Sequence, residues 1–271
     1  MAKAKTAGIA GESQLHYSTA WIFDTHLVTH GCQDEALLDL PQSIESDTLY
    51  LVGDVIDFWR MRRASYWPQS HNDVVQKLLR KARKGTRVVL TPGNHDDMLR
   101  GYLDHEFGRI LVVGDAIHET AAGHRLLVIH GDQFDSVVAR APWLGHLGTH
   151  ANAASQLVNQ WFNWGRLKLG YPYWSLSGYL KHKVKHRGQF IANYENALVE
   201  EARRRGVDGV VCGHIHYPQH KTLDGILYYN DGDWVDNRTA LVEHESGELE
   251  LLRWPEAATV KRTDEVIALV S

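Results

Sequence analysis

The sequence predicts an α/β protein in which two mixed β-sheets pack together and helices lie outside them. In the first half of the chain, β-rich apolar runs alternate with segments of helical periodicity, which is typical of strand–helix–strand units. In residues 221–254, apolar and polar residues alternate between glycines, which predicts a β-meander. Strand–helix alternation followed by β-rich pairing favours packed sheets that are covered by helices.

Short runs of β-branched, aromatic and other apolar residues predict the strands of the alternating part. They cover residues 17–23, 48–52, 87–90, 125–129 and 209–212. Each run is followed almost at once by aspartate, histidine or asparagine. We therefore expect each of these strands to end where a polar loop begins.

The helices are predicted at residues 32–40, 69–84 and 191–205. In the second of these, Val74 and Leu78 recur at helical spacing, with Val75 beside them. Pro41 is expected to stop the first helix, since proline lacks the N–H that a helix interior needs. Glycine after the last turn is a common helix ending, so Gly85 is the expected end of the second helix.

Composition narrows the class of protein. At 271 residues, the chain can form one large α/β domain or a domain with an insertion. A formal net charge of −4 gives no global basic field, so nucleic acid is not an expected partner. The two cysteines cannot make a disulfide framework, which fits a reducing cytoplasm. Residues 1–12 lack the apolar core of a secretory signal, and no apolar run approaches the ~20 residues of a membrane span.

One segment differs from the rest, because no Asp or Glu occurs between Asp135 and Glu195. This segment is rich in tryptophan, tyrosine, lysine and arginine. We expect a flexible N-terminal segment at 1–16, a core at 17–135 and 191–271, and an inserted, mostly helical cap at 136–190. The exclusion of acidic residues favours an anionic or amphiphilic partner, such as a membrane surface. The alternative is a pair of packed helices whose basic residues simply face solvent.

Chemistry-bearing fragments follow the predicted strands in order along the chain. They are Asp24-Thr25-His26, Gly53-Asp54-Val55-Ile56-Asp57, Gly93-Asn94-His95-Asp96, His130-Gly131-Asp132 and Gly213-His214-Ile215-His216. Carboxylate and imidazole together suit divalent ions such as Mn²⁺, Fe²⁺ and Zn²⁺. The fragments can therefore supply a mixed His/Asp/Asn shell for two divalent ions, which is a hydrolytic site and not a structural one.

The spacing within the fragments explains how they could share ions. Residues two apart in extended backbone point to the same face, so Asp24 and His26 can bind one ion. His214 and His216 have the same spacing. Asp54 could bridge two ions through its two oxygens, and a neutral oxygen from Asn94 limits the negative charge.

A pair of ions about 3.5–4 Å apart can clamp a phosphoryl group and acidify a bound water. The leaving oxygen then needs a proton donor. His95 stands beside Asn94 but is not spaced as a ligand, so it is placed for that role. Asp57 could accept a hydrogen bond from His95 and fix its tautomer, or it could cap the turn that follows.

The ordered fragments resemble those of the calcineurin-like metallophosphoesterases, over residues of about 17–254. This resemblance implies an αββα sandwich and two divalent metal ions, for which Mn²⁺ is expected and Fe²⁺ or Zn²⁺ is possible. It also implies the Asp57–His95 pair as the acid dyad. The implied ligands are Asp24, His26, Asp54 and His216 for one ion, and Asp54, Asn94, His130 and His214 for the other.

Within this family, the spacing and the stretch His130-Gly131-Asp132-Gln133 are similar to the UDP-2,3-diacylglucosamine pyrophosphatase group. Those enzymes cleave a lipid-linked pyrophosphate to UMP and an acylated sugar phosphate in lipid A synthesis. A helical insertion after their H-G-D motif holds the acyl chains, and the acid-free segment falls in that place. The resemblance implies a hydrolase in the cytoplasm, peripheral on the inner face of the membrane, with a lipid-linked phosphate substrate.

Three positions depart from that group. His95 stands where its members carry Arg, Phe23 where a small residue is usual, and Val28 where Gly is usual. A histidine acid is more useful when an alkoxide leaves than when a phosphate leaves. The chain could therefore be a paralogue acting on another phosphodiester or phosphomonoester. A third hypothesis is a scaffold that keeps the fold without catalysis.

Further polar residues are assigned from their positions. Basic residues near the site are expected to bind a substrate phosphate, with an exposed basic turn as the alternative for the arginines. These substrate-binding candidates are Arg60, Arg62, Arg63, Lys181 and Lys183. Asp96, Asp132, Asp231 and Asp233 are expected to support ligands or turns. His71 and His118 are expected on the surface.

Overall fold

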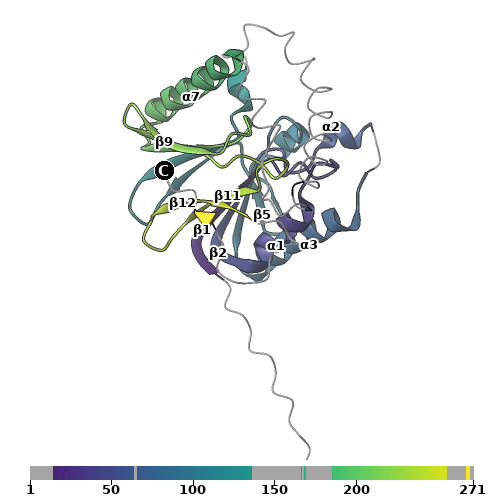
Figure 1. Ribbon diagram of the computed structural model, residues 1–271. Coiled ribbons are helices and arrows are strands. Elements are labelled where there is room, and N and C mark those ends of the chain that lie inside the picture. The colour runs from purple at the N-terminus through teal and green to yellow at the C-terminus, as the bar shows by residue number, and fades with distance from the viewer. Residues whose placement is uncertain are drawn as a thin grey trace, which may run out of the picture.

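The computed structural model describes residues 15–63, 66–135, 166, 168, 185–254 and 267–268. Most of the predicted N-terminal segment and nearly all of the predicted cap lie outside these residues. The described chain forms two β-sheets with helices on their outer faces, as Figure 1 shows.

The larger sheet has eight strands within the described residues. Their order is β13 (Ile267–Ala268), β12 (Leu249–Arg253), β11 (Thr239–Glu243), β1 (Leu15–Phe23), β2 (Ile44–Val52), β3 (Arg87–Thr91), β5 (Ile110–Val112) and β4 (Glu106–Phe107). Strands β1, β2 and β3 run parallel, and β11 joins β1 antiparallel. The carboxyl ends of three neighbouring parallel strands therefore meet at one edge of this sheet.

The smaller sheet has five strands, counted over the same described part of the chain. Their order is β6 (Ala116–Glu119), β7 (Arg125–Ile129), β8 (Gly209–Cys212), β10 (Ile226–Asn230) and β9 (Gln219–Leu223). Strands β7, β8 and β10 are parallel, whereas β6 and β9 close the edges antiparallel. This sheet too has parallel strands whose carboxyl ends lie at one edge.

Three apolar clusters define the layers of the molecule. Helices α1 (Asp34–Ser43) and α3 (Gln69–Lys84) pack on the larger sheet through residues such as Leu40 and Val74. Helix α7 (Lys185–Arg205) packs on the smaller sheet through Tyr194 and Leu198. A third cluster, which includes Trp21 and Tyr50 from the larger sheet and Leu126 and Val211 from the smaller, lies between the sheets. This helix–sheet–sheet–helix order confirms the predicted αββα sandwich (Figure 1).

Short helical turns complete the described chain. Helix α2 (Phe58–Met61) follows β2, and the 3₁₀ turns η1 (Asp97–Tyr102) and η2 (Asp132–Phe134) follow β3 and β7. Helix α2 and η1 come directly after fragments that the sequence singled out, and η2 begins at Asp132, the last residue of such a fragment. Helix α3 has the predicted bounds, and Gly85 ends it in the left-handed conformation with φ of 117°.

Two predictions about single elements were wrong. Helix α1 continues past Pro41 to Ser43, and the proline side chain is buried. A proline so close to the end of a helix removes one hydrogen bond, and burial of its ring offsets part of that loss. The predicted meander is two separate hairpins, because β9 and β10 belong to the smaller sheet whereas β11 and β12 belong to the larger.

Two predicted domain boundaries fall inside regular elements. Strand β1 begins at Leu15, which pairs with Ile44, so the core begins before residue 17. Helix α7 begins at Lys185 and runs through residues 190 and 191 without a break. The extra turn of α7 is rich in basic and polar residues, so hydrophobic periodicity gave no sign of it.

Candidate metal centre

The topology brings the predicted ligands to one place. Asp24, Asp54 and Asn94 follow β1, β2 and β3, which are parallel neighbours in the larger sheet. His130 and His214 follow β7 and β8, which are parallel neighbours in the smaller sheet. Side chains that follow parallel strands gather at the carboxyl edge of a sheet. His130 of the smaller sheet lies close to Asp54 and Asn94 of the larger sheet, so the carboxyl edges of both sheets face one centre.

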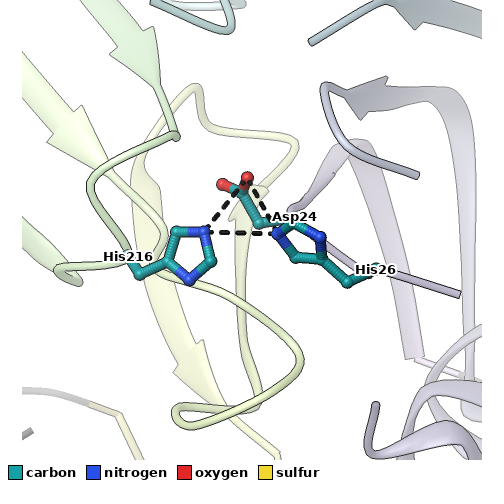
Figure 2. A group of neighbouring side chains, drawn as sticks. All are labelled: Asp24, His26 and His216. Atoms are coloured by element: carbon teal, nitrogen blue, oxygen red, sulfur yellow. Dashed lines mark hydrogen bonds and ion pairs between the residues drawn. The ribbon is translucent and has the colours of Figure 1, made fainter. Parts of the chain in front are cut away.

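Asp24, His26 and His216 form the first group of this centre (Figure 2). Oδ1 of Asp24 lies 3.5 Å from Nε2 of His216 and 3.9 Å from Nε2 of His26. The two Nε2 atoms are 3.3 Å apart. Two atoms that each lie about 2.0–2.2 Å from one ion can be no more than about 4.4 Å apart. The spacing therefore fits three ligands of a single ion.

Asp54 joins this group to the other sheet. Its Oδ2 atom lies 3.8 Å from Nε2 of His26 and 3.7 Å from Nε2 of His130. Nε2 of His130 is also 3.4 Å from the amide oxygen of Asn94. Asp24, Asp54 and His130 form a further group whose ligand atoms all lie within 4.8 Å of one another. The Asp54 carboxylate thus faces imidazoles that come from both sheets.

His214 is placed differently from the other predicted ligands. Its ring lies 5.1 Å from that of His130, measured between centroids, so it borders the same group. Its Nε2 atom, however, is 2.7 Å from Oδ1 of Asp135, a residue that the sequence patterns did not single out. Its backbone N–H donates to Oδ2 of Asp24 at 2.9 Å. In this structure His214 contacts Asp24 through its backbone and Asp135 through its ring.

The backbone at several of these residues is strained. Positive φ angles occur at Asp24 (46°), His26 (47°), Asp54 (49°), His214 (68°) and His216 (53°). Such angles cost a non-glycine residue roughly 1–3 kcal/mol, and they persist where the surrounding structure enforces them. Strain that is concentrated on the residues of one cluster is typical of a functional site.

Glycines allow the loops to approach these side chains. A Cβ atom at Gly53 would overlap the His130 ring, and one at Gly213 would meet Oδ2 of Asp24. A Cβ at Gly93 would overlap Oδ1 of Asp54. Because the side chains fill the space that a larger residue would occupy, glycine is needed at each of these positions.

Two further carboxylates hold the loops. Oδ1 of Asp233 accepts the backbone N–H groups of Val235, Asp236 and Asn237, while its Oδ2 lies 2.9 Å from Nδ1 of His216. Asp233 therefore has the supporting position that the sequence suggested, since it fixes which nitrogen of His216 faces Asp24.

Asp96 holds the loops of β2 and β3 in the same way. Its two oxygens accept the backbone N–H groups of Asp54 at 3.3 Å, Val55 at 2.8 Å and Gly93 at 2.6 Å. The Asp96 carboxylate thus ties the backbone that carries Asp54 to the backbone that leads to Asn94. It supports both loops and is not one of the grouped ligand atoms.

The electrostatics of the cluster suit a bound cation. Burial and the negative charge of Asp24 raise the pKa of Asp54 well above its ordinary value. Burial lowers the pKa of His130 and of His26, so both imidazoles favour the neutral form that binds metals. Oδ1 of Asp24 is buried and makes no hydrogen bond within the described structure. A divalent ion would compensate these buried groups, so the donor set fits a metal.

His95 and Asp57 lie together beside the centre. Nδ1 of His95 is 3.0 Å from Oδ2 of Asp57, and its Nε2 is 4.0 Å from Oδ2 of Asp54. Burial would lower the pKa of His95, but the contact with Asp57 and the charge of Asp54 outweigh it, and the pKa is raised. Asp57 also caps α2, because its Oδ1 accepts the N–H of Arg60 at 2.8 Å. Asp57 thus caps α2 through Oδ1, and its Oδ2 lies beside Nδ1 of His95.

Trp59 is a neighbour of this pair that sequence reasoning missed. Its ring centroid lies 4.4 Å from that of His95, with the planes tilted by 33°. His26 meets the His95 ring edge-on, at 4.9 Å between centroids. Trp59 is 45% exposed, which is high for an aromatic residue, so part of it faces solvent beside His95. The proximity of Trp59 to Asp57 in sequence was the one signal available.

The predicted substrate-binding residues are only partly described. Nε of Arg60 lies 3.4 Å from Oδ2 of Asp57, so Arg60 borders the acid pair. Arg62 and Arg63 are exposed on the turn after α2. Lys181 and Lys183 lie outside the described residues. Among the described candidates, the geometry links Arg60 alone to the centre.

Two histidines expected on the surface are not there: His71 is buried, and the His118 side chain is only 11% exposed. Nδ1 of His71 accepts the backbone N–H of Val28 at 3.0 Å, and Val28 itself has a φ of 88°. Nε2 of His118 lies 2.8 Å from Oε2 of the buried Glu243. Both predictions were wrong because the partners are far away in sequence, and a lone polar residue in an amphipathic pattern carries no sign of them.

The chain matches the calcineurin-like phosphoesterase family over residues 20–218, which include every residue of the centre up to His216. The chain belongs to this family. Members are expected to bind divalent metals, and the grouped His and Asp side chains described above are candidate ligands. The family and the hydrolases named below support a metal-dependent phosphoester hydrolase.

Two curated relatives carry the name UDP-2,3-diacylglucosamine hydrolase. One, from Photorhabdus laumondii, is 30% identical over 117 residues, which cover 42% of this chain and 48% of the relative. The match thus spans about half the length of that relative. The other, from Proteus mirabilis, is 22% identical over 228 residues, or 79% of this chain and 88% of the relative.

A solved structure described as a novel archaeal phosphodiesterase is also similar. The two chains are 13% identical, and the match covers 87% of this chain and 98% of the other, with a TM-score of 0.43. Within the described part of this chain, none of the helices has both the length and the apolar character needed to cross a bilayer.

Proposed function

We propose that this chain is a dinuclear, metal-dependent phosphohydrolase that acts on an amphiphilic phosphate substrate. The first ion would be held by Asp24, His26, Asp54 and His216, and the second by Asp54, Asn94, His130 and His214. Mn²⁺ is the proposed metal, with Fe²⁺ or Zn²⁺ as alternatives that the same donors accept.

The position of Asp54 carries this proposal. One of its oxygens, Oδ2, faces Nε2 atoms of His26 at 3.8 Å, of His130 at 3.7 Å and of His95 at 4.0 Å. A carboxylate that faces ligands from both sheets is suited to be shared between two ions. The Asp54 side chain is 3% exposed, so water could not stabilise its negative charge if the two ions were absent.

When bound, the two ions would polarise the phosphoryl oxygens and acidify a water molecule. The residues of the chain do the rest. Nδ1 of His95 faces the Asp57 carboxylate at 3.0 Å, which favours the imidazolium form of the ring, and in that form Nε2 also carries a proton, toward the centre. That proton can pass to the oxygen that leaves phosphorus. Asp57 orients the imidazole and stabilises its protonated form, and Trp59 covers one face of the ring.

The most specific form of the proposal is hydrolysis of the pyrophosphate of UDP-2,3-diacylglucosamine to UMP and an acylated sugar phosphate in lipid A synthesis. The names of the two curated relatives support this substrate. The absence of acidic residues between Asp135 and Glu195 also supports it, since a basic, aromatic segment suits an anionic lipid. On this proposal residues 136–190 form a cap, and the enzyme works at the cytoplasmic face of a membrane.

His95 favours a second candidate function. A sugar phosphate is a good leaving group and needs little protonation, whereas an alkoxide needs a proton donor. The His95 and Asp57 pair is built as such a donor. A phosphodiesterase or phosphomonoesterase with another amphiphilic substrate would use this pair more fully.

The experiment is a comparison of substrates on the full chain loaded with Mn²⁺. UDP-2,3-diacylglucosamine, bis-p-nitrophenyl phosphate and a simple alkyl phosphomonoester are each assayed. Release of UMP at a kcat/KM far above the other two supports the specific proposal. Preference for the alkyl ester supports the second candidate. No hydrolysis of any substrate by protein that contains metal would contradict both and indicate a non-catalytic scaffold.

A further inference from the structure

Tyr194 of α7 connects the helix to the loops that follow β7 and β8. Its side chain is fully buried in the core between α7 and the smaller sheet. The hydroxyl lies 3.2 Å from the carbonyl oxygen of His130 and 3.1 Å from the carbonyl oxygen of Gly213. One phenol therefore faces the backbone at two strand ends that carry proposed ligands.

These two strand ends are also tied to each other. The N–H of Gly213 donates to the carbonyl of His130 at 3.2 Å, so the β7 and β8 ends are already paired there. The carbonyl of Gly213 accepts a further hydrogen bond, at 2.9 Å, from Nδ2 of Asn230. The Tyr194 hydroxyl joins this network at the carbonyl of Gly213, the residue before His214. A single O–H can donate to one carbonyl or be shared between the two.

The loop packs closely against this hydroxyl. Gly131, the residue after His130, has a φ of 105°, and a Cβ there would overlap the Tyr194 oxygen. The Tyr194 ring also lies 6.0 Å from the His214 ring, measured between centroids. The hydroxyl thus contacts the backbone of both loops, the one that carries His130 and the one that carries His214.

We propose that Tyr194 is a positioning residue for the second ion, because its hydroxyl sets the separation of the strand ends that carry His130 and His214. This inference rests on the proposed dinuclear function. It assigns no chemical step to Tyr194, which does not reach the reacting groups. The first ion, held mainly by residues after β1 and β2, depends less on this contact.

The size of the effect follows from the hydrogen bond. A buried neutral hydrogen bond contributes about 1 kcal/mol net, and 1.4 kcal/mol is a factor of ten in a binding constant. Loss of the hydroxyl should therefore weaken the second ion about fivefold. The first ion should change by less than about twofold on the same scale.

The chain offers a matched control. Tyr228 on β10 is equally buried and belongs to the same core cluster as Tyr194. Within the described structure its hydroxyl is bonded to neither the His130 nor the Gly213 carbonyl. Tyr194→Phe and Tyr228→Phe each remove one buried phenol oxygen, but only the Tyr194 hydroxyl is bonded to the carbonyls of His130 and Gly213.

The test is calorimetric titration of the metal-stripped full chain with Mn²⁺. The binding step that disappears in His130→Ala identifies the second ion. The expected result is a second-ion Kd about fivefold higher in Tyr194→Phe and unchanged in Tyr228→Phe. Circular dichroism of the metal-free variants checks the fold. A Tyr194→Phe chain that is unfolded would contradict the inference, since the hydroxyl is assigned a local role.

The outcomes separate this inference from the function on which it rests. A wild-type chain that binds fewer than two Mn²⁺ ions would contradict the dinuclear proposal. Two ions that bind equally well to the wild type and to Tyr194→Phe would overturn the role of Tyr194 alone. Equal weakening by both phenylalanine variants would also overturn it, because the effect would then come from the core in general.

Discussion

Nδ1 of His216 lies 2.9 Å from Oδ2 of Asp233, while its Nε2 lies 3.5 Å from Oδ1 of Asp24. The imidazole is therefore held between two carboxylates that have different tasks. Asp233 orients the ring, and Asp24 faces the place proposed for the first ion. Burial would lower the pKa of His216, but the charges of Asp24 and Asp233 raise it well above its ordinary value.

Replacing Asp233 with Asn should weaken binding of the first ion. The charge that orients His216 is lost, and such partners of metal-bound histidines are worth roughly 10–100-fold in metal affinity. Mn²⁺ titration of the stripped protein measures this change. Asp224→Asn, an exposed carboxylate on the turn between β9 and β10, is the control. An unchanged Kd in Asp233→Asn would show that His216 needs no such partner.

Replacing His95 with Ala should affect substrates according to their leaving groups. Alkyl esters need a proton on the departing oxygen and should slow by about 10²–10⁴-fold, the usual worth of a general acid. Activated aryl esters such as bis-p-nitrophenyl phosphate should slow much less. The ratio of kcat values for the two substrate types is the measurement. An equal loss for both would indicate that His95 binds substrate or supports the loop instead of donating a proton.

Trp59→Leu should produce a milder form of the same pattern. The Trp59 ring covers one face of His95 at 4.4 Å, so its loss frees the imidazole to rotate away from the centre. We expect kcat for alkyl esters to fall by about tenfold or less, with metal binding unchanged, since orientation accounts for only part of a general acid's contribution. Trp67→Leu is the matched control, because Trp67 is similarly exposed, at 41%, and its ring contacts His71, not His95. An equal effect of both substitutions would argue against the role of Trp59.

His71→Ala should destabilise the fold without removing a proposed ligand. His71 is fully buried and accepts the N–H of Val28, whose positive φ needs a fixed partner. A cavity and an unpaired buried N–H together should lower the free energy of unfolding by about 2–4 kcal/mol. Urea unfolding of the metal-free chain measures it. His124→Ala, at an exposed turn, should change stability by less than about 0.5 kcal/mol; a similar small change in His71→Ala would contradict the argument.

Sequence patterns could predict where the ligands lie because that information is local. An apolar run ends, a polar fragment begins, and the carboxyl ends of parallel strands meet at one edge. This local pattern predicts Asp24, Asp54 and His130 as ligands. In the structure their ligand atoms lie within 4.8 Å of one another. The helix–sheet–sheet–helix order followed from the same alternation together with the family resemblance.

What could not be predicted depends on contacts between distant segments. Asp135 is bonded to His214, and Tyr194 is bonded to the carbonyls of His130 and Gly213. These partners are far apart in sequence, so hydrophobic periodicity does not indicate that they meet. The change of sheet between β10 and β11 is of the same kind, because two hairpins and one meander have the same alternating pattern. Pro41 was misjudged since burial in the tertiary structure overrides a local helix stop.

The most direct test of the central claim, that Asp54 is shared by two ions, is the number of Mn²⁺ ions bound by the purified full chain and by Asp54→Ala. Equilibrium dialysis with metal analysis gives the stoichiometry, and electron paramagnetic resonance shows whether bound ions are coupled. Asp97→Ala, which removes an exposed carboxylate at the start of η1, is the control. We predict two coupled ions in the wild type and in Asp97→Ala, and the loss of coupling, of bound metal and of hydrolysis in Asp54→Ala. Two coupled ions and normal turnover in Asp54→Ala, or no more than one ion in the wild type, would contradict the account.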